Sequence, residues 1–411
     1  MIKKVSILCS SIILCAQSYS AHATDSYIIV DVGSSSSKVY FCYEDRLDCD
    51  KALTTKRGLH HYKKINALKR NDSGSWKETT SQHIRHLIKK SLRLYKKKNR
   101  GFRGLKGFYA YASAGIRSII DISQEPKLFE KDINKFLNDL FVQQLYIINQ
   151  KRLANGRRSI DIPVEFDTLT GTEEAAYTLL GLNYGKEKSE FEDINDMDGF
   201  SMQHATLVLD EAERGPYSID LDYKGEVYKI EGNSYFLGVD QSWNAVVGQD
   251  ADHPCVIGIN AKENKEDSLD QCIQAVKSYV AQQQVQEVTP SERELILMGN
   301  GYKHPLKSLG LHGGQQTVED FMKVLESTAL DVCSMSKADY IATYMSSPQN
   351  QQQAESNFDR YHKAYCFDLV HYKVILEQLN LPQSQILNLN FSQDISWIKG
   401  KLMMITDQNR L

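Results

Sequence analysis

Two short stretches of the chain carry the residue types of a phosphate-binding site, and they have the same shape. YIIVDVGSSSSKVYFC at 27–42 and DINDMDGFSMQHATLVLD at 193–210 each run into an Asp, then a Gly- and Ser-containing turn, then a second apolar strand. A tight hairpin of this kind directs backbone N–H groups and hydroxyls into one concavity that can bind phosphate oxygens. Asp31 and Asp196 lead the turns, where a carboxylate can hold a hydrated cation. The repeat predicts a duplicated domain that closes on one polyphosphate from both sides.

The elements that must position these hairpins are mixed strands and helices, which predict an α/β fold of two lobes with a cleft between them. We expect the first lobe at 24–163 and the second at 164–392, because the polar segment 149–166 contains Pro163 and indicates a hinge. ELILMGNGY at 294–302 is typical of a buried strand that ends in a Gly-rich turn. The hydrophobic spacing further predicts helices near 80–98, 126–140, 169–185, 268–284 and 317–330, and strands near 108–119 and 216–232.

The first 23 residues have the pattern of a secretory signal peptide. Lys3 and Lys4 precede a mostly apolar stretch at 5–16, and Ala21-His22-Ala23 supplies small residues around a cleavage point. An uncleaved anchor is the alternative, but the apolar stretch is short for a bilayer. No other stretch is long and apolar enough to cross a membrane, so we expect an exported protein, periplasmic or secreted, without stable membrane insertion.

Cleavage of this leader would remove Cys9 and Cys15 and leave six cysteines. An even number of cysteines in an oxidising compartment favours disulfides. Zinc ligation is the alternative, but the chain has no Cys-x-x-Cys spacing. The simplest pairing joins sequence neighbours: Cys42–Cys49, Cys255–Cys272 and Cys333–Cys366.

The charge balance gives no support to nucleic-acid binding. The formal net charge is −3, and loss of Lys3 and Lys4 with the leader would make it −5. One local exception is the densely basic stretch RHLIKKSLRLYKKKNRGFRGLK at 85–106. Its Leu and Ile residues at helical spacing predict a helix with a solvated cationic face. A role in steering an anionic ligand or touching a membrane surface is the alternative.

Five motifs in order resemble the apyrase conserved regions of the secreted or membrane-anchored nucleoside triphosphate diphosphohydrolases, here an exported bacterial member. They are DVGSSSSK (31–38), ASAGIR (112–117), GTEEAAY (171–177), DMDGFSMQ (196–203) and SYFLG (234–238). MGNGY, YCFDLVHYKVILEQL and ISWIKG, later in the chain, are also similar to family segments. The resemblance implies the actin and sugar-kinase fold, with two ribonuclease-H-like lobes. It also implies removal of terminal phosphates from nucleoside tri- and diphosphates with Mg²⁺ or Ca²⁺, and a C-terminal helix at about 393–411 that packs back on the first lobe.

The resemblance also implies roles for five side chains. Glu174 matches the glutamate that acts as base, and Glu173 beside it cannot share the same helix face. Ser201 and Gln203 match the residues that position the attacking water. Asp31 and Asp196 match the carboxylates that hold the metal through its waters, although each also suits a turn-capping Asp.

The same motifs imply a first phosphate loop of Gly33, Ser34, Ser35 and Ser36. Lys38 falls where some soluble members place an Arg. Its ammonium could contact a phosphate oxygen, and a solvated Lys at the start of a strand is the alternative. For Arg117 two roles stay open, neutralising phosphate charge or bracing a carboxylate of the site.

The second loop, of Asp198, Gly199 and Phe200, departs from the family pattern, which has two glycines here. A side chain with a negative charge near a phosphate nest should obstruct anion binding unless Asp198 points away or captures a cation. We therefore expect weaker or narrower activity than in a typical member. A nucleotide-binding protein without turnover is one alternative function.

An exopolyphosphatase or guanosine pentaphosphate phosphatase is the other alternative, because those enzymes share Asp-x-Gly-Ser, Ser-Ala-Gly-x-Arg and Glu-Glu-Ala motifs. Gln203, the ISWIKG tail and the leader favour the apyrase assignment. Base recognition in the family is aromatic stacking, for which Tyr302, Tyr365 and Tyr372 are the candidates.

Overall fold

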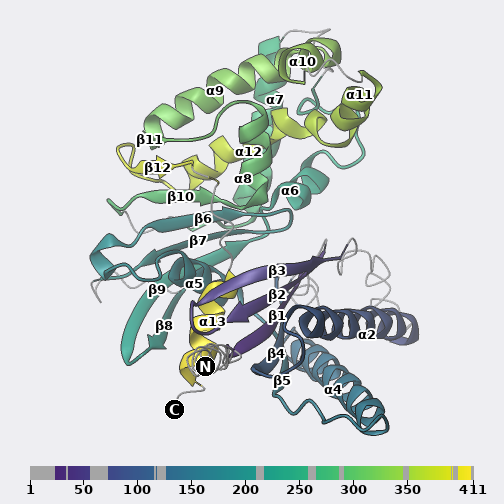
Figure 1. Cartoon of the computed structure of the whole chain (residues 1–411). Helices are drawn as coiled ribbons and strands as arrows, with labels where there is room; N and C mark the ends of the chain where they lie inside the picture. The colour runs from purple at the N-terminus through teal and green to yellow at the C-terminus, as the bar shows by residue number, and fades with distance from the viewer. Residues whose placement is uncertain are drawn as a thin grey trace, which may run out of the picture.

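The computed structural model describes residues 24–33, 36–55, 73–114, 117, 126–209, 217–257, 265–286, 291–345, 351–389, 391 and 397–408. Two mixed β-sheets, each covered by helices, form an α/β architecture of two lobes, as predicted (Figure 1). The leader and two residues of the first phosphate loop, Ser34 and Ser35, lie outside the described residues.

The first sheet has the strand order β3-β2-β1-β4-β5. β1 pairs antiparallel with β2 and parallel with β4. Because its sequence is mostly apolar, it occupies the centre of the sheet, where every one of its residues is buried. The bounds are β1 Ser26–Val32, β2 Ser37–Tyr43, β3 Asp48–Thr54, β4 Leu105–Ala112 and β5 Val164–Thr168.

The second sheet, of order β11-β12-β10-β6-β7-β9-β8, repeats the first. β6 pairs antiparallel with β7 and parallel with β10, as β1 does with β2 and β4. Both hairpins turn through four residues, so Asp31 faces Lys38 as Asp196 faces Gln203. The bounds are β6 Asp193–Met197, β7 Met202–Leu207, β8 Ser218–Tyr223, β9 Glu226–Tyr235, β10 Leu295–Met298, β11 Gln315–Thr317 and β12 Ile386–Asn388.

The expected lobe boundary at residue 163 falls one strand too early, because the next strand, β5, belongs to the first sheet. The segment expected to be a hinge begins inside α4 (Pro126–Leu153) and ends in β5 (Val164–Thr168), which pairs parallel with β4 in the first sheet. β5 is an edge strand with only Phe166 and Thr168 buried, so its sequence is polar enough to be mistaken for a linker. The Gly-rich turn expected after β10 is instead the start of a helix, α8 (Gly299–Ser308).

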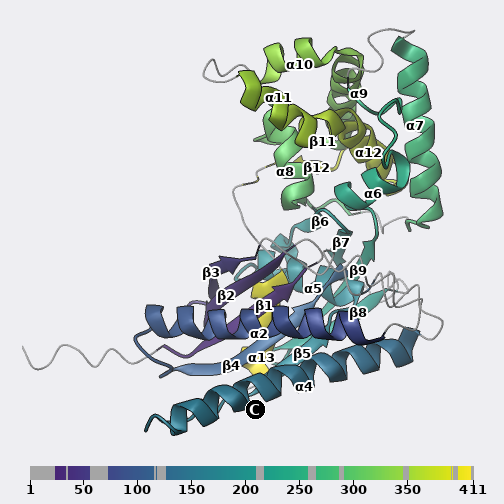
Figure 2. The ribbon, with the colours of Figure 1, turned by 90° about the vertical axis from the view of Figure 1, so that its right-hand side faces the viewer.

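The helices form three layers with the sheets between them (Figures 1 and 2). α2 (Ser73–Lys98) and α4 cover the outer face of the first sheet, and their apolar sides share one buried cluster with it. α5 (Gly171–Leu182) and α13 (Trp397–Gln408) lie between the sheets and join them in a second cluster. The outer side of the second sheet carries α6 Val239–Val246, α7 Lys265–Gln282, α8, α9 Val318–Ser334, α10 Lys337–Tyr344, α11 Gln351–Arg360 and α12 Tyr365–Gln378.

The C-terminal helix contacts both lobes rather than the first alone. The Trp397 ring meets the Tyr111 ring of β4 edge-on, with centroids 5.8 Å apart. At its other end, Asp407 accepts a hydrogen bond of 3.1 Å from the backbone N–H of Lys224 in the β8–β9 turn. The helix therefore joins the two sheets, as α5 does.

The three predicted disulfides are present: Cys42–Cys49, Cys255–Cys272 and Cys333–Cys366. The first closes the β2–β3 hairpin, and the third joins α9 to α12. In the part of the chain that the structure describes, no helix combines the length and apolarity needed to span a bilayer.

The crossing of α5 and α13 depends on two glycines. A Cβ at Gly400 would overlap the carbonyl oxygen of Tyr177, and a Cβ at Gly181 would lie 2.9 Å from the Gly400 nitrogen. Gly400→Ala should therefore lower the free energy of unfolding by about 2 kcal/mol, the usual size of an overpacking penalty, in a urea titration. Gly101→Ala is the control, because only the Arg103 nitrogen lies near, at 3.9 Å. Equal stability of both variants would show that the helices separate without cost.

Candidate active site

A cleft of about 780 Å³ lies between the lobes and is lined by both. β1, β4, β6 and β10, the central parallel strands, all end at it, and the residues that follow their carboxyl ends line it. Ligands of open α/β sheets bind at this edge. The predicted residues that line the cleft are Asp31, Gly33, Ser36, Lys38, Glu174, Asp196, Asp198, Gly199, Phe200, Ser201, Gln203 and Tyr365.

Asp31 and Lys38 form a pair across the first hairpin. Their carboxylate and ammonium groups lie 3.7 Å apart, and Asp31 is buried. Burial outweighs the ammonium and raises the pKa of Asp31 to about 6, with the nearby charges of Glu174 and Asp198 acting in the same direction. Asp31 in turn raises the pKa of Lys38, and Asp198 adds to this effect. Lys38 is therefore held beside a carboxylate and is not a solvated surface residue.

Asp31 and Asp196 suit a hydrated cation better than a directly coordinated one. The buried Oδ1 atom of Asp31 has no hydrogen-bond partner among the described residues, and both carboxylates line the cleft. The described part of the chain holds no group of three or more His, Cys, Asp or Glu side chains arranged as metal ligands. Two carboxylates would leave most coordination positions of the ion to water and phosphate. This suits Mg²⁺, which keeps several of its waters when bound.

The amino end of α5 separates the two neighbouring glutamates, as expected. Thr170 caps the helix by accepting a hydrogen bond from the Glu173 N–H at 3.1 Å, while the Glu173 carboxylate accepts one from the Thr170 N–H at 2.8 Å. This capping box occupies Glu173. Glu174, one residue on, is buried and lines the cleft.

Arg117 braces Glu174, which is one of the two roles that its motif left open. Its guanidinium lies 2.7 Å from the Glu174 carboxylate. It also donates hydrogen bonds to the Leu169 carbonyl at 3.1 Å and to the Ser234 hydroxyl at 3.0 Å. Since Ser234 belongs to β9 of the second sheet, Arg117 links Glu174 to both lobes.

Ser201 and Gln203 meet on the second hairpin. The Gln203 amide nitrogen donates hydrogen bonds to Ser201 Oγ at 2.6 Å and Ser234 Oγ at 3.2 Å, and both predicted residues are buried. Gln203 therefore reaches the same serine as Arg117. The Glu174–Arg117 pair and the Gln203–Ser201 pair converge on Ser234, which the sequence analysis placed in a motif without a role.

Asp198 has a partner that no local spacing could reveal. Its Oδ1 atom accepts a hydrogen bond of 3.1 Å from the backbone N–H of Asn300, in the first turn of α8. The carboxylate is therefore turned toward a helix end, although its charge still acts on Asp31 and Lys38. The next residue is Gly199, and a Cβ there would displace the exposed Asp240 carboxylate.

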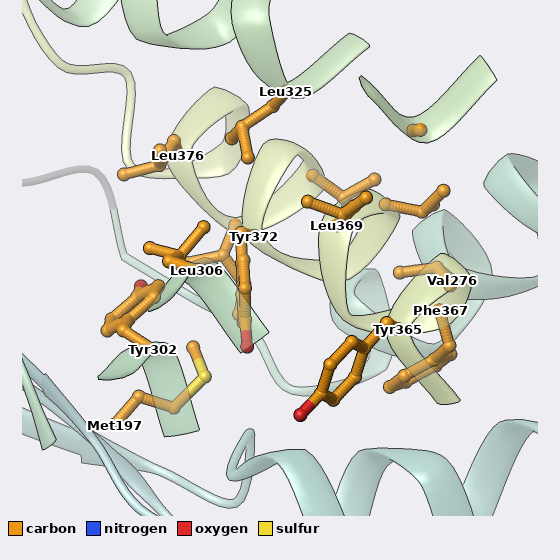
Figure 3. Packing of buried hydrophobic residues seen from close by; sticks show 14 of the residues in the cluster. Met197, Val276, Tyr302, Leu306, Leu325, Tyr365, Phe367, Leu369, Tyr372 and Leu376 are labelled. Atoms are coloured by element: carbon orange, nitrogen blue, oxygen red, sulfur yellow. The ribbon is translucent and has the colours of Figure 1, made fainter. Parts of the chain in front are cut away.

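Two of the three tyrosines expected to stack on a base are in the core, so that prediction is wrong for them. Tyr302 and Tyr372 are fully buried, with ring centroids 4.8 Å apart (Figure 3). The Tyr302 hydroxyl donates to Asn195 Oδ1 at 2.9 Å, and the Tyr372 hydroxyl to the Gly301 carbonyl at 2.5 Å. Tyr365 lines the cleft, but its side chain is 6% exposed and its ring lies against that of His362.

Side chains outside every predicted motif line the far part of the cleft. Tyr361, 51% exposed, presents a ring there, with the Arg360 guanidinium 4.9 Å from its centroid. Lys303, His304 and Lys363 add cationic or titratable groups. They come from α8 and from the junction of α11 and α12. No motif marks these segments, so only the fold brings them to the site.

The fold is similar to that of solved phosphohydrolase structures. Nucleoside triphosphate hydrolases from Neospora caninum share 11% identity, with 94% of this chain and 93% of that chain covered and a TM-score of 0.61. A Ppx/GppA family member from Aquifex aeolicus shares 12% identity, with 94% and 99% covered and a TM-score of 0.49. No protein-family model matches the chain, and its sequence matches no curated protein. The first likeness shows that this chain shares its two-lobed α/β fold with the Neospora caninum structure.

Removal of the Arg117–Glu174 ion pair should lower the free energy of unfolding by a measurable amount. Arg117→Ala leaves the Glu174 carboxylate without its ion pair, which should cost about 3 kcal/mol in urea unfolding. The double variant Arg117→Ala/Glu174→Gln should recover part of this loss, because it removes the unpaired charge as well. Arg117→Lys keeps the positive charge but not the forked guanidinium. Its free energy of unfolding should lie between those of the wild type and of Arg117→Ala. An additive double variant would mean that the two side chains do not interact in solution.

Proposed function

We propose that this protein is an exported, divalent-metal-dependent hydrolase that removes terminal phosphates from nucleoside tri- and diphosphates. The observation that carries the proposal is the pair of hairpins of equal geometry, each with an Asp at its turn, that line one cleft together with Glu174. A phosphoanhydride placed between these turns would have its terminal phosphorus within reach of a carboxylate, an amide and a hydroxyl.

The protein's own side chains supply the water chemistry. Gln203 and Ser201 would hold the attacking water. The amide nitrogen of Gln203 is committed to two hydroxyls, so its carbonyl oxygen is the atom left to accept a hydrogen bond from that water. Glu174 would take the proton as the water attacks in line with the departing phosphate oxygen. Arg117 keeps the Glu174 carboxylate in the cleft.

A divalent cation, when bound, would neutralise charge on the phosphate oxygens. Asp31 and Asp196 are the residues that would hold it through water. The Oδ1 atom of Asp31, for which the described residues offer no hydrogen-bond partner, supports this assignment. Gly33 and Ser36 would contribute to the first phosphate loop. The Lys38 ammonium is paired with Asp31 and has further N–H donors with which it would contact a phosphate oxygen.

A nucleotide fits the cleft better than a bare polyphosphate chain. Tyr361 offers an exposed ring at a distance from the hairpins, on which a nucleobase could stack, whereas phosphate alone would contact only its hydroxyl. The fold likeness to the Neospora caninum nucleoside triphosphate hydrolases is in keeping with this choice. Three disulfides and the pattern of the first 23 residues support an exported protein.

Substitution of the proposed base tests the function directly. Wild-type protein should release phosphate from ATP or ADP with Mg²⁺ or Ca²⁺, and a chelator should abolish the release. Glu174→Gln keeps the size of the side chain but cannot accept the proton. It should reduce kcat by at least a hundredfold, while nucleotide binding, measured by calorimetry, changes little.

Glu173→Gln is the matched control, because Glu173 caps α5 and does not enter the cleft. It should retain kcat within a few-fold. Long-chain polyphosphate belongs in the same assay. Its hydrolysis in preference to every nucleotide would reject the nucleotide assignment, and binding without any turnover would reject the enzyme.

The charge of Asp198 should weaken substrate binding. Asp198→Asn keeps an acceptor for the Asn300 N–H and removes the negative charge from the phosphate loop. We expect KM for the metal–nucleotide complex to fall roughly fivefold, because relief of repulsion in a partly solvated site amounts to about 1 kcal/mol. Asp198→Gly should lower KM as well but lose stability with the cap. If both variants kept the wild-type KM and turnover of ATP, the charge would not face the phosphates.

A further inference from the structure

The surface at the carboxyl ends of α2 and α4 concentrates positive charge that the proposed function does not use, whereas Asp132 and Asp139 are exposed in the first half of α4. Both helices bury one side against the first sheet, so their solvent sides form one continuous surface (Figure 2). The segments 82–106 and 151–160 contain no Asp or Glu. We call the following residues the basic face: Lys96, Lys97, Arg100, Arg103, Lys151, Arg152, Arg157 and Arg158.

The two helix ends that form the basic face lie side by side. The Arg152 guanidinium lies 4.8 Å from the centre of the Phe102 ring, which joins the end of α4 to the turn after α2. The Arg152 side chain also donates a hydrogen bond of 2.8 Å to the Arg158 carbonyl. Exposed Arg85, Lys89 and Arg93 extend the charge along α2 for about 18 Å more.

The positive charges of the basic face are not compensated within the described protein. None of its residues makes an ion pair with a described residue, whereas neighbouring Lys98 pairs with Asp50 and Lys106 with Asp25. Arg152 and Arg157 are close enough to repel one another, and this repulsion acts with burial to lower the pKa of Arg152. Like charges held together without partners suit an anionic ligand outside the molecule.

The eight residues of the basic face lie too far from the cleft to steer its substrate, although an earlier part of α2 comes close to it, where the His83 ring lies 3.3 Å from Ser37 Oγ. The start of β1 is bonded to the Gly104 carbonyl next to the basic face, and Gly33 in the cleft follows the other end. The strand is about 20 Å long, which exceeds the screening length of about 8 Å at physiological salt. Of the two alternatives to a solvated face, steering is therefore disfavoured.

Apolar side chains beside the charges distinguish a lipid surface from a nucleic acid. Val142, Tyr146 and Leu153 are 50%, 62% and 54% exposed. At 100° per residue they form one narrow stripe on the solvent side of α4. A phosphodiester backbone has no use for exposed aliphatic groups, whereas a bilayer accepts them at the headgroup boundary, where Tyr is also favoured.

We propose that the α2/α4 surface binds peripherally to an anionic phospholipid bilayer through the basic face, with the stripe Val142, Tyr146 and Leu153 at the headgroups. The cleft shares none of these residues, so it would stay open to solution. The proposal requires no membrane-spanning segment and does not depend on the hydrolase assignment.

The test is flotation of the full chain with vesicles of phosphatidylcholine alone or with 30% phosphatidylglycerol. We expect binding to the anionic vesicles only, with loss of binding between about 0.1 and about 0.5 M NaCl, a range over which the screening length falls about twofold. The triple variant Lys97→Gln, Arg157→Gln and Arg158→Gln should reduce the partition coefficient about a hundredfold, since each basic residue contributes about fivefold. Tyr146→Ser should weaken vesicle binding further without changing thermal unfolding.

The matched control is Lys277→Gln, Lys307→Gln and Lys323→Gln, which removes the same charge from exposed positions of the second lobe. It should bind vesicles within twofold of wild type. Equal loss in both triple variants, or equal binding to neutral and anionic vesicles, would overturn the proposal. So would tighter binding to a 20-base-pair DNA duplex that is insensitive to Tyr146→Ser, which would make this surface a nucleic-acid interface.

Discussion

The packing of α5 between the two sheets is the constraint on which the cleft depends. The helix leaves the carboxyl end of β5, so its first turn delivers Glu174 to the edge where both hairpins end. The rest of the helix must then pass between the two sheets. α13 crosses it where Gly181 of α5 meets Gly400 of α13, and neither helix has room for a Cβ there. Close backbone contacts of two helices thus position the backbone of Glu174, and Arg117 holds its carboxylate.

Charge is divided along the cleft, and the division explains what the site requires of a ligand. The end near the hairpins holds Asp31, Glu174, Asp196 and Asp198, while its cations are already committed, Lys38 to Asp31 and Arg117 to Glu174. A polyphosphate can approach this end only together with a cation, because its own charge would otherwise face several carboxylates. The far end, by contrast, offers Lys303, Arg360 and Lys363 beside Tyr361. In the proposed function, a metal-bound phosphate would occupy the first end and the rest of the nucleotide the second.

Residues close in sequence were predictable, and partners distant in sequence were not. The hairpins follow from a local pattern of Asp, turn and apolar strand, and each disulfide joins neighbouring cysteines. The bond from Asn300 to Asp198 spans 102 positions, so the same residue could equally have been an obstruction. Tyr302 and Tyr372 show the same limit. Whether a Tyr ring lies in the core or in a cleft depends on how α8 and α12 pack against each other. The position of each Tyr within its own helix does not determine this.

The repeat also explains why the two hairpins are not equivalent chemically. Equal turns place Asp198 where the first hairpin has Gly33, and Gln203 where it has Lys38. A Cβ at Gly33 would lie 2.8 Å from the Ser36 carbonyl, whereas the second turn carries Asp198 there, whose carboxylate accepts a hydrogen bond from the start of α8. A charged Lys opposite Asp31 balances a buried carboxylate, and a neutral amide opposite Asp196 can hold water without competing for its proton. One backbone frame thus supports charge balance on one side of the cleft and water placement on the other, which is the asymmetry that attack on a terminal phosphate needs.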